Sequence, residues 1–437
     1  MAEPVLQVAL DFLESSRALA CAREAVRGGV RILEAGTPLI KSAGLDAVRA
    51  LRREFPRHPI VADLKIMDAG RTEIEAAAKA GATAATVLGV AAEATILECV
   101  EAGRNCGIDV VVDLVQAPDP EGLAARCEAW GVAQVDVHTP IDEQMRGRDP
   151  FEVLRRVRKA TRLPVGVAGG LNSETAPLAV LAGGDIIIVG GAITKSPGAE
   201  EAARTILRAM ADRRPVATEL FRRGGEERLR EIFGKVSTPN VSDAMHRSGD
   251  LPGLLPVVPG ARLAGPAVTV RTYPGDWAKP VEAIESAREG DVIVIDAGGV
   301  GPAVWGELAS ESCLQRKIAG VVIDGAIRDV ADIRRIGFPA FARLITPTAG
   351  EPRGFGEMQV TVKLGGVAVS PGDWIVGDDS GVVRVPRGRA VEVANQAMDV
   401  LEKENRLREE IRRSATLSSV VDLAKWEKQI VEGGGSR

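Results

Sequence analysis

The chain has 437 residues, more than one ordinary hydrophobic core organises, so its length predicts two domains of roughly 200 residues each. A formal charge of −5 and an aromatic content of 3% argue against a nucleic-acid partner, because they supply neither a basic surface nor stacking rings. The five cysteines form no Cys-x-x-Cys pair, no apolar run approaches the ~20 residues of a membrane-spanning helix, and the first residues do not resemble a signal peptide. We therefore expect a cytoplasmic protein with reduced thiols and no membrane partner.

Residues 5–211 repeat one pattern, in which a short apolar run is followed by a turn and then by a stretch with helical spacing. The eight apolar runs are "VLQVALD", "VRILEAG", "PIVADLK", "TAATVLG", "IDVVVDL", "VAQVDVH", "LPVGVAGG" and "DIIIVGG". Strands that alternate with helices indicate a parallel sheet, and eight repeats predict a closed barrel. We assign residues 1–211 to an α/β fold of the (β/α)8 TIM-barrel type.

The character of the sequence changes after residue 211. Residues 212–232 are rich in charge and contain Pro215 and a glycine pair, which indicates a linker. Residues 233–412 contain irregularly spaced strands, a hairpin signal in "VAVSPGDWIVGDDSGVVRVP" and a long charged helix over residues 388–413. These features predict a second α/β domain with a mixed sheet of the swivelling β/β/α type, followed by a tail over residues 413–437.

Barrels of this type hold their chemistry at the C-terminal ends of the strands. A single acid there is more often a helix cap or part of an ion pair, and a glycine pair alone is as often only a tight turn. In this chain, however, polar residues and glycines occupy most of the strand ends: Asp11, Glu34, Asp63, Lys65, Asp113, His138, Gly169, Gly170, Gly190 and Gly191. As a set they indicate a site.

Asp63 and Lys65 lie two residues apart on one strand, so their side chains are expected on the same face. With Glu34 on the preceding strand, two carboxylates would adjoin, and a hard cation such as Mg²⁺ would separate their charges. His138 ends its strand facing the interior and is a candidate for proton transfer, although a lone histidine is more often structural. The two glycine pairs would present backbone N–H groups to a phosphate.

The segments "ALD", "EAGTPLIKSAG", "ADLKIMDAG", "DVHTPIDEQ", "VAGGLN" and "VGGAIT" resemble the 3-hexulose-6-phosphate synthase family of the orotidine-monophosphate decarboxylase suprafamily over residues 5–211. The resemblance implies condensation of formaldehyde with D-ribulose 5-phosphate, or the reverse cleavage, in a homodimer. It implies Mg²⁺ or Mn²⁺ as cofactor. The residues that it implies are Glu34 and Asp63 as metal ligands, Lys65 and Asp68 as polar active-site residues with Asp68 reaching across the dimer interface, His138 for proton transfer, and Gly170, Gly190 and Gly191 on the phosphate. We add Asp11 and Gly169 as substrate-binding candidates.

Sister enzymes of this suprafamily decarboxylate 3-keto-L-gulonate 6-phosphate. Their pattern has Arg directly after the histidine and Arg in the last phosphate loop. Thr139 and Gly191 stand at those positions here. This difference favours the synthase, with the decarboxylase as the alternative.

In the second half, Glu307 is followed by Arg328 and Asp329 after the strand-like run "AGVVIDG". An Arg-Asp pair is as often a surface ion pair, but its place at a strand end favours an anion site. Residues 233–412 resemble, through "TPNVSDAMHR", "WGELA", "DGAIRDV" and "PGDWIVGDDSGVVRVP", the family of regulator-of-ribonuclease-activity-A-like proteins, which includes 4-hydroxy-4-methyl-2-oxoglutarate aldolases.

That resemblance implies Arg328 on the carboxylate of a small oxo-acid, and Asp329 with Glu307 on a divalent metal. The aldolases have Asp where this chain has Glu307. Two alternatives therefore stay open for the second half. One is a metal-dependent aldolase or oxaloacetate decarboxylase, and the other is a non-catalytic ribonuclease regulator or a trimer-forming module.

Overall fold

The computed structural model describes residues 3–413 and 416–421 and divides the chain into two compact units. The described residues of the first unit lie within 1–144, 148–223 and 402–437, and the second unit contains 145–147 and 224–401. The chain thus leaves the first unit after Arg223 and returns to it at Glu402. Residues 402–412, which the sequence assigned to the second domain, group with the first unit.

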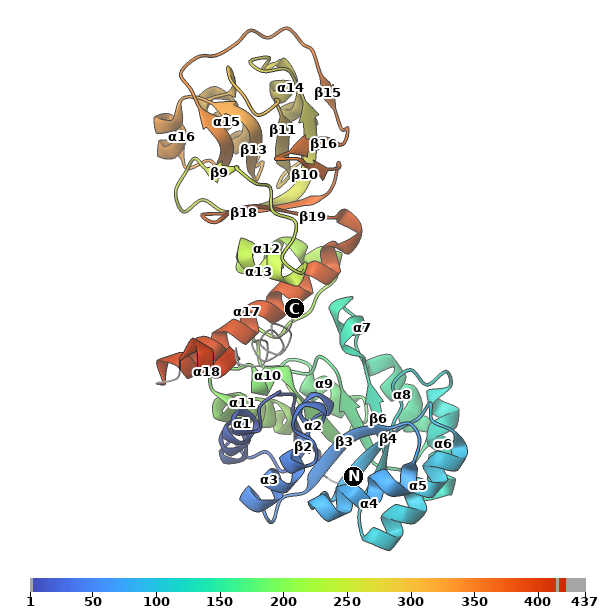
Figure 1. Cartoon of the computed structure of the whole chain (residues 1–437). Coiled ribbons are helices and arrows are strands. Elements are labelled where there is room, and N and C mark those ends of the chain that lie inside the picture. Colours follow the sequence, from blue (N-terminus) through green and yellow to red (C-terminus); the bar gives the residue numbers. More distant parts are fainter. Residues whose placement is uncertain (1–2, 414–415, 422–437) are drawn as a thin grey trace, which may run out of the picture. The chain divides into compact units, whose positions relative to one another are not determined.

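Eight parallel strands close into a barrel in the first unit, as the repeat predicts (Figure 1). The strands are β1 (Val5–Leu10), β2 (Ile32–Ala35), β3 (Ile60–Ile66), β4 (Ala84–Leu88), β5 (Asp109–Asp113), β6 (Gln134–His138), β7 (Val165–Ala168) and β8 (Ile186–Val189). The helices that follow them are α1 (Ser15–Arg27), α2 (Thr37–Ala43), α3 (Asp46–Glu54), α4 (Gly70–Ala80), α5 (Glu93–Cys106), α6 (Pro120–Trp130), α7 (Ile141–Met145), α8 (Phe151–Ala160), α9 (Ala176–Leu181), α10 (Gly191–Thr194) and α11 (Ala199–Asp212). Helices α4, α5 and α6 each end at a glycine in the left-handed conformation, a common helix C-cap.

Alternation along the strands decides which side chains face the inside of the barrel. One large core cluster combines every second strand residue with the inner faces of the helices. A separate cluster consists of strand residues alone and includes Ile32, Val61 and Val111. Because strand side chains alternate, Glu34, Asp63 and Asp113, each two positions further along the same strands, also face the interior, toward the C-terminal ends of the strands.

The second unit is built on a mixed sheet in the order β19-β18-β10-β11-β13-β14-β9, with β12 on β13 and β15 on β10. Its strands are β9 (Leu255–Pro256), β10 (Leu263–Arg271), β11 (Val292–Asp296), β12 (Ala303–Trp305), β13 (Gly320–Ile327), β14 (Ala340–Ile345), β15 (Glu357–Met358), β18 (Trp374–Asp378) and β19 (Gly381–Val385), with a separate hairpin of β16 (Val362–Leu364) and β17 (Val367–Val369). Strands β10, β11, β13 and β14 pair in parallel, whereas β18, β19 and β9 join antiparallel. The predicted mixed sheet is confirmed, and the expected hairpin is β18–β19.

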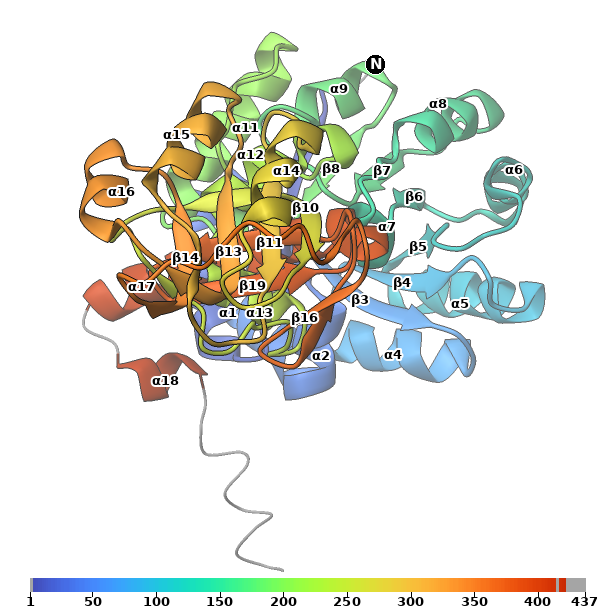
Figure 2. The same cartoon turned by 90° about the horizontal axis from the view of Figure 1, so that it is seen from above.

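Helices of the second unit cover one face of this sheet (Figure 2). They include α14 (Ala278–Ser286), α15 (Glu307–Gln315) and α16 (Val330–Ile336), whose residues Ile284, Cys313 and Ile333 share a core with alternate strand residues. The intervening strand residues form a second core with the β16–β17 hairpin. The remaining helices are η1 (Glu226–Arg228), α12 (Leu229–Lys235), α13 (Thr238–Ala244), η2 (Arg387–Arg389) and α17 (Ala390–Arg412), of which the last continues into the first unit, where α18 (Leu417–Val421) also lies.

Residues 213–223, which we call the strap, belong to the first unit and contain no helix or strand. The sequence placed them in a linker over residues 212–232, of which residues 226–232 are helical and belong to the second unit. All five cysteines are free, and all but Cys106 are buried. Among the described residues, no helix has both the length and the apolar character needed to cross a membrane.

Candidate active site

Asp63 and Lys65 meet where β3 departs from regular strand geometry. Lys65 has a left-handed backbone with φ of 50°, and the register with β4 shifts between Ala62 and Ile66. The Lys65 N–H donates to the Thr86 hydroxyl at 3.0 Å. A left-handed conformation is uncommon for a residue with a side chain, and such residues cluster at functional sites. Lys65 Nζ lies 3.0 Å from Asp63 Oδ1, so the structure brings the two predicted residues together, although not through regular alternation.

The Asp63 carboxylate is held by donors on three sides. Its Oδ2 atom accepts a hydrogen bond from the Thr37 hydroxyl at 2.7 Å, and Oδ1 accepts one from the Thr86 hydroxyl at 2.9 Å besides the contact with Lys65. Only 9% of this side chain is exposed. Fully bonded buried polar groups are rigid, so the orientation of Asp63 is fixed before any ligand arrives.

Asp113, the last residue of β5, connects Lys65 to His138. Its Oδ2 atom lies 3.0 Å from Lys65 Nζ and 3.0 Å from His138 Nδ1, and its Oδ1 atom accepts the Val115 N–H at 2.9 Å. Burial acts to raise the pKa of Asp113, but the hydrogen bond and charge of His138 and the charge of Lys65 outweigh burial and lower it. An ionised carboxylate can only accept, so His138 donates through Nδ1, which leaves Nε2 for proton exchange.

The charges around Asp113 are stabilised against burial. Burial acts to lower the pKa of Lys65, but Asp63 and Asp113 outweigh it and raise that pKa, so the side chain is an ammonium group. Burial likewise acts to lower the pKa of His138, and the hydrogen bond and charge of Asp113 outweigh it, so the net shift is upward. The site therefore combines a fixed cation with a group that can take up a proton.

Asp136 lies below this pair on β6, two residues before His138, and is 7% exposed. It accepts a hydrogen bond from Gln134 Nε2 at 2.6 Å. Burial raises the pKa of Asp136 to about 7 against the lowering effect of that hydrogen bond. A second, weakly acidic group thus lies under the proton-transfer candidate.

Glu34 adds a further buried acid beside Asp63. Its Oε2 atom accepts the Gln7 side-chain N–H at 2.6 Å, and burial followed by the charges of Asp63 and Asp11 raises its pKa well above the usual value. Within residues 3–413 and 416–421, no group of three or more His, Cys, Asp or Glu side chains is arranged to hold a metal ion. The acidic pair nevertheless fits an oxygen-preferring divalent cation that retains water ligands, because a cation would offset the repulsion that favours the neutral form of Glu34.

Two glycine-containing loops follow the last two strands. In the first glycine loop (residues 169–175), Gly169 and Gly170 have φ values of 108° and 70°, and a Cβ on Gly169 would lie only 2.6 Å from the Thr139 carbonyl oxygen. In the second glycine loop (residues 190–198, which include the short helix α10), a Cβ on Gly191 would lie 3.6 Å from Lys195 Nζ. The backbone of both loops is accessible where side chains are absent, and a cation flanks the second loop.

The two remaining predicted residues of the barrel lie at its mouth. Asp11 follows β1, is exposed, and has its Oδ2 atom 3.4 Å from where a Cβ on Gly190 would lie. Asp68 is also exposed, in the turn between β3 and α4. Within this chain Lys65 is paired with Asp63 and Asp113. The role of Asp68 across a dimer interface stays a prediction.

Several residues of the site take part in contacts that the sequence pattern does not predict. In the sequence Asp113 is only a strand end; β4 separates its strand from that of Asp63, and the signal that could have indicated its place is the parity that it shares with Asp63. Thr37 and Thr86 are hydroxyls whose bonds to Asp63 depend on tertiary contacts. Lys195 follows the last predicted glycine pair by four residues, a spacing that could have indicated a cation beside that pair.

In the second unit, the three predicted residues meet around one carboxylate. Asp329 Oδ2 accepts from Arg328 Nε at 3.2 Å and from the backbone N–H of Glu307 at 3.2 Å. Glu307 begins α15 and Asp329 precedes α16 with a left-handed φ of 57°. Arg328 is 44% exposed, so this cluster lies at the surface. Nearby on β13, buried Asp324 is paired with Arg343.

Comparison with known proteins agrees with this geometry. The family described as "Orotidine 5'-phosphate decarboxylase / HUMPS family" matches residues 4–206, and the 3-hexulose-6-phosphate synthase of Bacillus subtilis is 37% identical over 199 residues, 45% of this chain and 94% of its own length. The chain belongs to this family. Several further relatives named 3-hexulose-6-phosphate synthase are 36–38% identical, and they support a lyase activity of the aldolase type for the barrel.

The second unit has its own relatives. The family described as "RraA-like: Aldolase/RraA" matches residues 238–384, so an RraA-like domain follows the HUMPS-family barrel.

Among solved structures, 3-hexulose-6-phosphate synthase from Salmonella typhimurium is 36% identical and covers 48% of this chain and 99% of its own, with a TM-score of 0.46. The RNA-processing inhibitor RraA from Thermus thermophilis is 28% identical and covers 35% of this chain and 93% of its own, with a TM-score of 0.33.

Proposed function

We propose that the barrel condenses formaldehyde with D-ribulose 5-phosphate to give 3-hexulose 6-phosphate, or catalyses the reverse cleavage. The observation that supports this most strongly is the Asp113 carboxylate, whose Oδ2 atom contacts both Lys65 Nζ and His138 Nδ1 at 3.0 Å. This places a fixed ammonium group beside an imidazole that can exchange a proton. The relatives with that name share the barrel and supply the substrate class.

The chemistry uses the site's own residues in a simple order. His138 Nε2 takes the proton from C1 of ribulose 5-phosphate, and the negative charge that develops on the enediolate oxygens is stabilised by the Lys65 ammonium. The enediolate carbon then attacks the carbon of formaldehyde, and the new alkoxide accepts the proton from His138. Asp113 and Asp63 keep Lys65 charged and oriented throughout.

A divalent cation, Mg²⁺ or Mn²⁺, is part of this proposal, with Glu34 and Asp63 as the side chains that would hold it. When bound, it would act as a Lewis acid toward the oxygens of the sugar and lower the energy of negative charge there. Gly169, Gly170, Gly190 and Gly191 would bind the phosphate through backbone N–H groups, with Lys195 as a nearby cation.

Two parallel assays distinguish the synthase from the decarboxylase. The full chain is incubated with ribulose 5-phosphate, formaldehyde and Mg²⁺, and the loss of formaldehyde is followed; a parallel sample receives 3-keto-L-gulonate 6-phosphate and is assayed for CO₂. Formaldehyde consumption without CO₂ release supports the synthase. CO₂ release without formaldehyde consumption would replace it by the decarboxylase, against the expectation from Thr139 and Gly191.

For the second unit we propose a small oxo-acid site at Arg328, supported by the exposed guanidinium beside Asp329. The measurement is pyruvate release from oxaloacetate with Mg²⁺. A unit that binds and converts no oxo-acid would instead be a regulatory or trimer-forming module.

A cytoplasmic location and a homo-oligomer with a barrel dimer are further parts of the proposal. The five free cysteines support the cytoplasmic location.

A further inference from the structure

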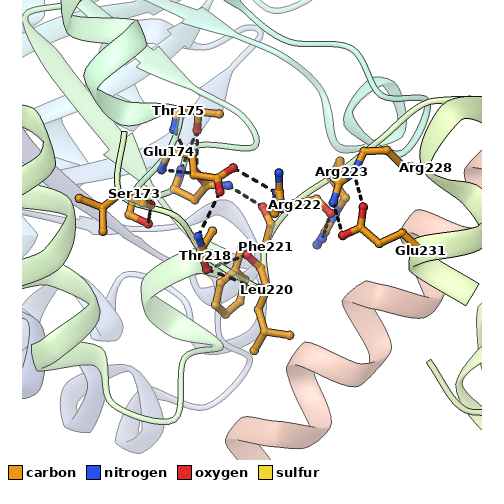
Figure 3. A network of polar contacts seen from close by, with 12 residues as sticks. Ser173, Glu174, Thr175, Thr218, Leu220, Phe221, Arg222, Arg223, Arg228 and Glu231 are labelled. Atoms are coloured by element: carbon orange, nitrogen blue, oxygen red, sulfur yellow. Dashed lines mark hydrogen bonds and ion pairs between the residues drawn. The ribbon is translucent and has the colours of Figure 1, made fainter. Parts of the chain in front are cut away.

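The strap lies along the first glycine loop and is bonded to it at several points. The Val216 N–H donates to the Ser173 carbonyl at 3.0 Å, and the Ser173 hydroxyl donates to the Val216 carbonyl at 2.8 Å. Glu174 accepts the Thr218 N–H at 3.1 Å and pairs with Arg222 at 3.1 Å, as Figure 3 shows. The loop that carries Gly169 and Gly170 is therefore attached to a segment outside the eight-fold repeat.

Asn172 links the loop to the strap by its side chain. Asn172 Oδ1 accepts the N–H groups of Glu174 at 2.8 Å and Thr175 at 3.1 Å, while Nδ2 donates to the Phe221 carbonyl at 2.7 Å. Asn172 is 3% exposed. One buried side chain thus shapes the turn after Gly170 and fastens it to Phe221.

Phe221 is in turn held by Glu402 of α17. Its backbone is left-handed, with φ of 60°, and its ring packs against the barrel core. The Phe221 N–H donates to Glu402 Oε1 at 2.5 Å, and Glu402, which is fully buried, also pairs with Arg223 at 2.7 Å. A bulky residue keeps such a backbone only where its surroundings enforce it.

The second glycine loop is held by residues of α17, the helix that also carries Glu402, and by Arg413 directly after it. Arg406 on α17 donates to the Ser196 carbonyl at 3.2 Å and pairs with Glu24 at 3.1 Å, and Arg413 donates to the Pro197 carbonyl at 3.2 Å. Arg406 is 4% exposed. Both loops of the proposed phosphate site therefore contact the strap or residues 402–413, and these segments lie outside the range 4–206 that matches the barrel family.

We propose that Glu402, acting through Phe221 and Asn172, and Arg406, acting through Ser196, are positioning residues that hold the two glycine loops in the conformation that binds the substrate phosphate. This inference rests on the proposed function. Glycines lose much conformational freedom when they are ordered, and a loop ordered in advance binds its ligand more tightly. The expected signature is an effect on phosphate binding and KM, with kcat preserved.

The decisive variant in the full chain is Asn172→Asp. It keeps the Oδ1 acceptor that shapes the turn but replaces the Nδ2 donor by an oxygen facing the Phe221 carbonyl. We expect the dissociation constant of inorganic phosphate and the KM for ribulose 5-phosphate to rise together by roughly 5- to 20-fold, with kcat within about twofold, as the loss of one buried hydrogen bond predicts. Amide hydrogen exchange of residues 169–175 should become faster.

Asn405→Asp is the matched control, because it makes the same chemical change on α17, where Asn405 contacts Arg408. It should change none of these quantities. Glu402→Gln provides a second perturbation in case Asn172→Asp is poorly folded, and it should act in the same direction through a weaker hold on Phe221 and Arg223.

Unchanged phosphate affinity and unchanged exchange in well-folded Asn172→Asp and Glu402→Gln would overturn the inference, as would a loss of kcat with phosphate affinity intact. A parent chain that binds phosphate but leaves ribulose 5-phosphate and formaldehyde unreacted would contradict the proposed function alone, because the phosphate and exchange measurements still test the loops. A parent chain that binds no phosphate would contradict both.

Discussion

Asp113→Asn is the sharpest test of the barrel site. The substitution preserves the size of a side chain that is 4% exposed but removes its charge. The Val115 N–H can keep an oxygen acceptor, which turns the new NH₂ group toward Lys65 and His138, where the parent has a carboxylate oxygen at 3.0 Å from each. Two charge-assisted hydrogen bonds are lost, each worth roughly 1.5–3 kcal/mol.

A loss of about 3 kcal/mol from the transition state corresponds to a fall in kcat/KM on the order of 10²-fold. The pH dependence should change as well. Asp113 raises the pKa of His138, so its removal lowers that pKa, and the acidic limb of the kcat/KM profile should move to lower pH if His138 acts as the base. The assay is formaldehyde consumption with ribulose 5-phosphate from pH 5.5 to 8.5.

Asp109→Asn is the control for this prediction, since Asp109 is exposed at the opposite end of the same strand. It should retain activity within about twofold, as expected for a surface substitution. Activity of Asp113→Asn within threefold of the parent, with the acidic limb unmoved, would refute the argument that Asp113 organises Lys65 and His138.

Four further predictions concern other residues. Burial raises the pKa of Asp136 to about 7, above its unfolded value of ~3.9, so the native state binds a proton that the unfolded state has lost, and its stability falls as the pH rises between these values. From pH 5 to pH 7 the free energy of unfolding of the parent, measured by urea denaturation, should fall by roughly 2–3 kcal/mol more than that of Asp136→Asn. Glu34→Gln should bind Mn²⁺ more weakly, as calorimetry can measure, and its activity should fall on the order of 10²-fold. Activity of the parent that survives EDTA would contradict the proposed role of the cation. Inactive Asp68→Ala and Lys65→Ala chains should regain activity when mixed, provided mass spectrometry shows subunit exchange; exchange without recovery would exclude a shared site. Arg328→Lys should weaken oxalate binding by roughly 1–3 kcal/mol in calorimetry while formaldehyde consumption stays within twofold, and equal affinities would remove the oxo-acid site.

The fold of the barrel was predictable because its signals are local. Each strand-like run such as "VLQVALD" lies next to a turn and a helical stretch, and periodicity alone assigns it. The interior position of Glu34 and Asp63 also followed, since strand order and parity determine it. The contact of Asp113 with Lys65 and His138 did not follow, because it joins residues 48 and 25 positions apart and depends on the left-handed backbone of Lys65.

The segments after the barrel were harder to predict for a different reason. Residues 213–223 have the composition of a solvated linker, and composition does not reveal that Phe221 packs against the barrel core or that Asn172 binds its carbonyl. Helix α17 was expected as one charged amphipathic helix and is one. Its charges gave no sign that Glu402 and Arg406 are buried, because a charged residue is normally exposed unless a distant partner is available.

The return of the chain to the first unit at Glu402 affects the order in which the protein folds during synthesis. All eight barrel strands have been made by residue 212, but Glu402 is added 190 residues later (402 − 212). At typical translation rates of about 5–20 residues per second, this interval is roughly 10–40 s. During that time the first unit lacks the segment that begins at Glu402, while residues 224–401 are being made. The eight strands are therefore complete before their own unit is.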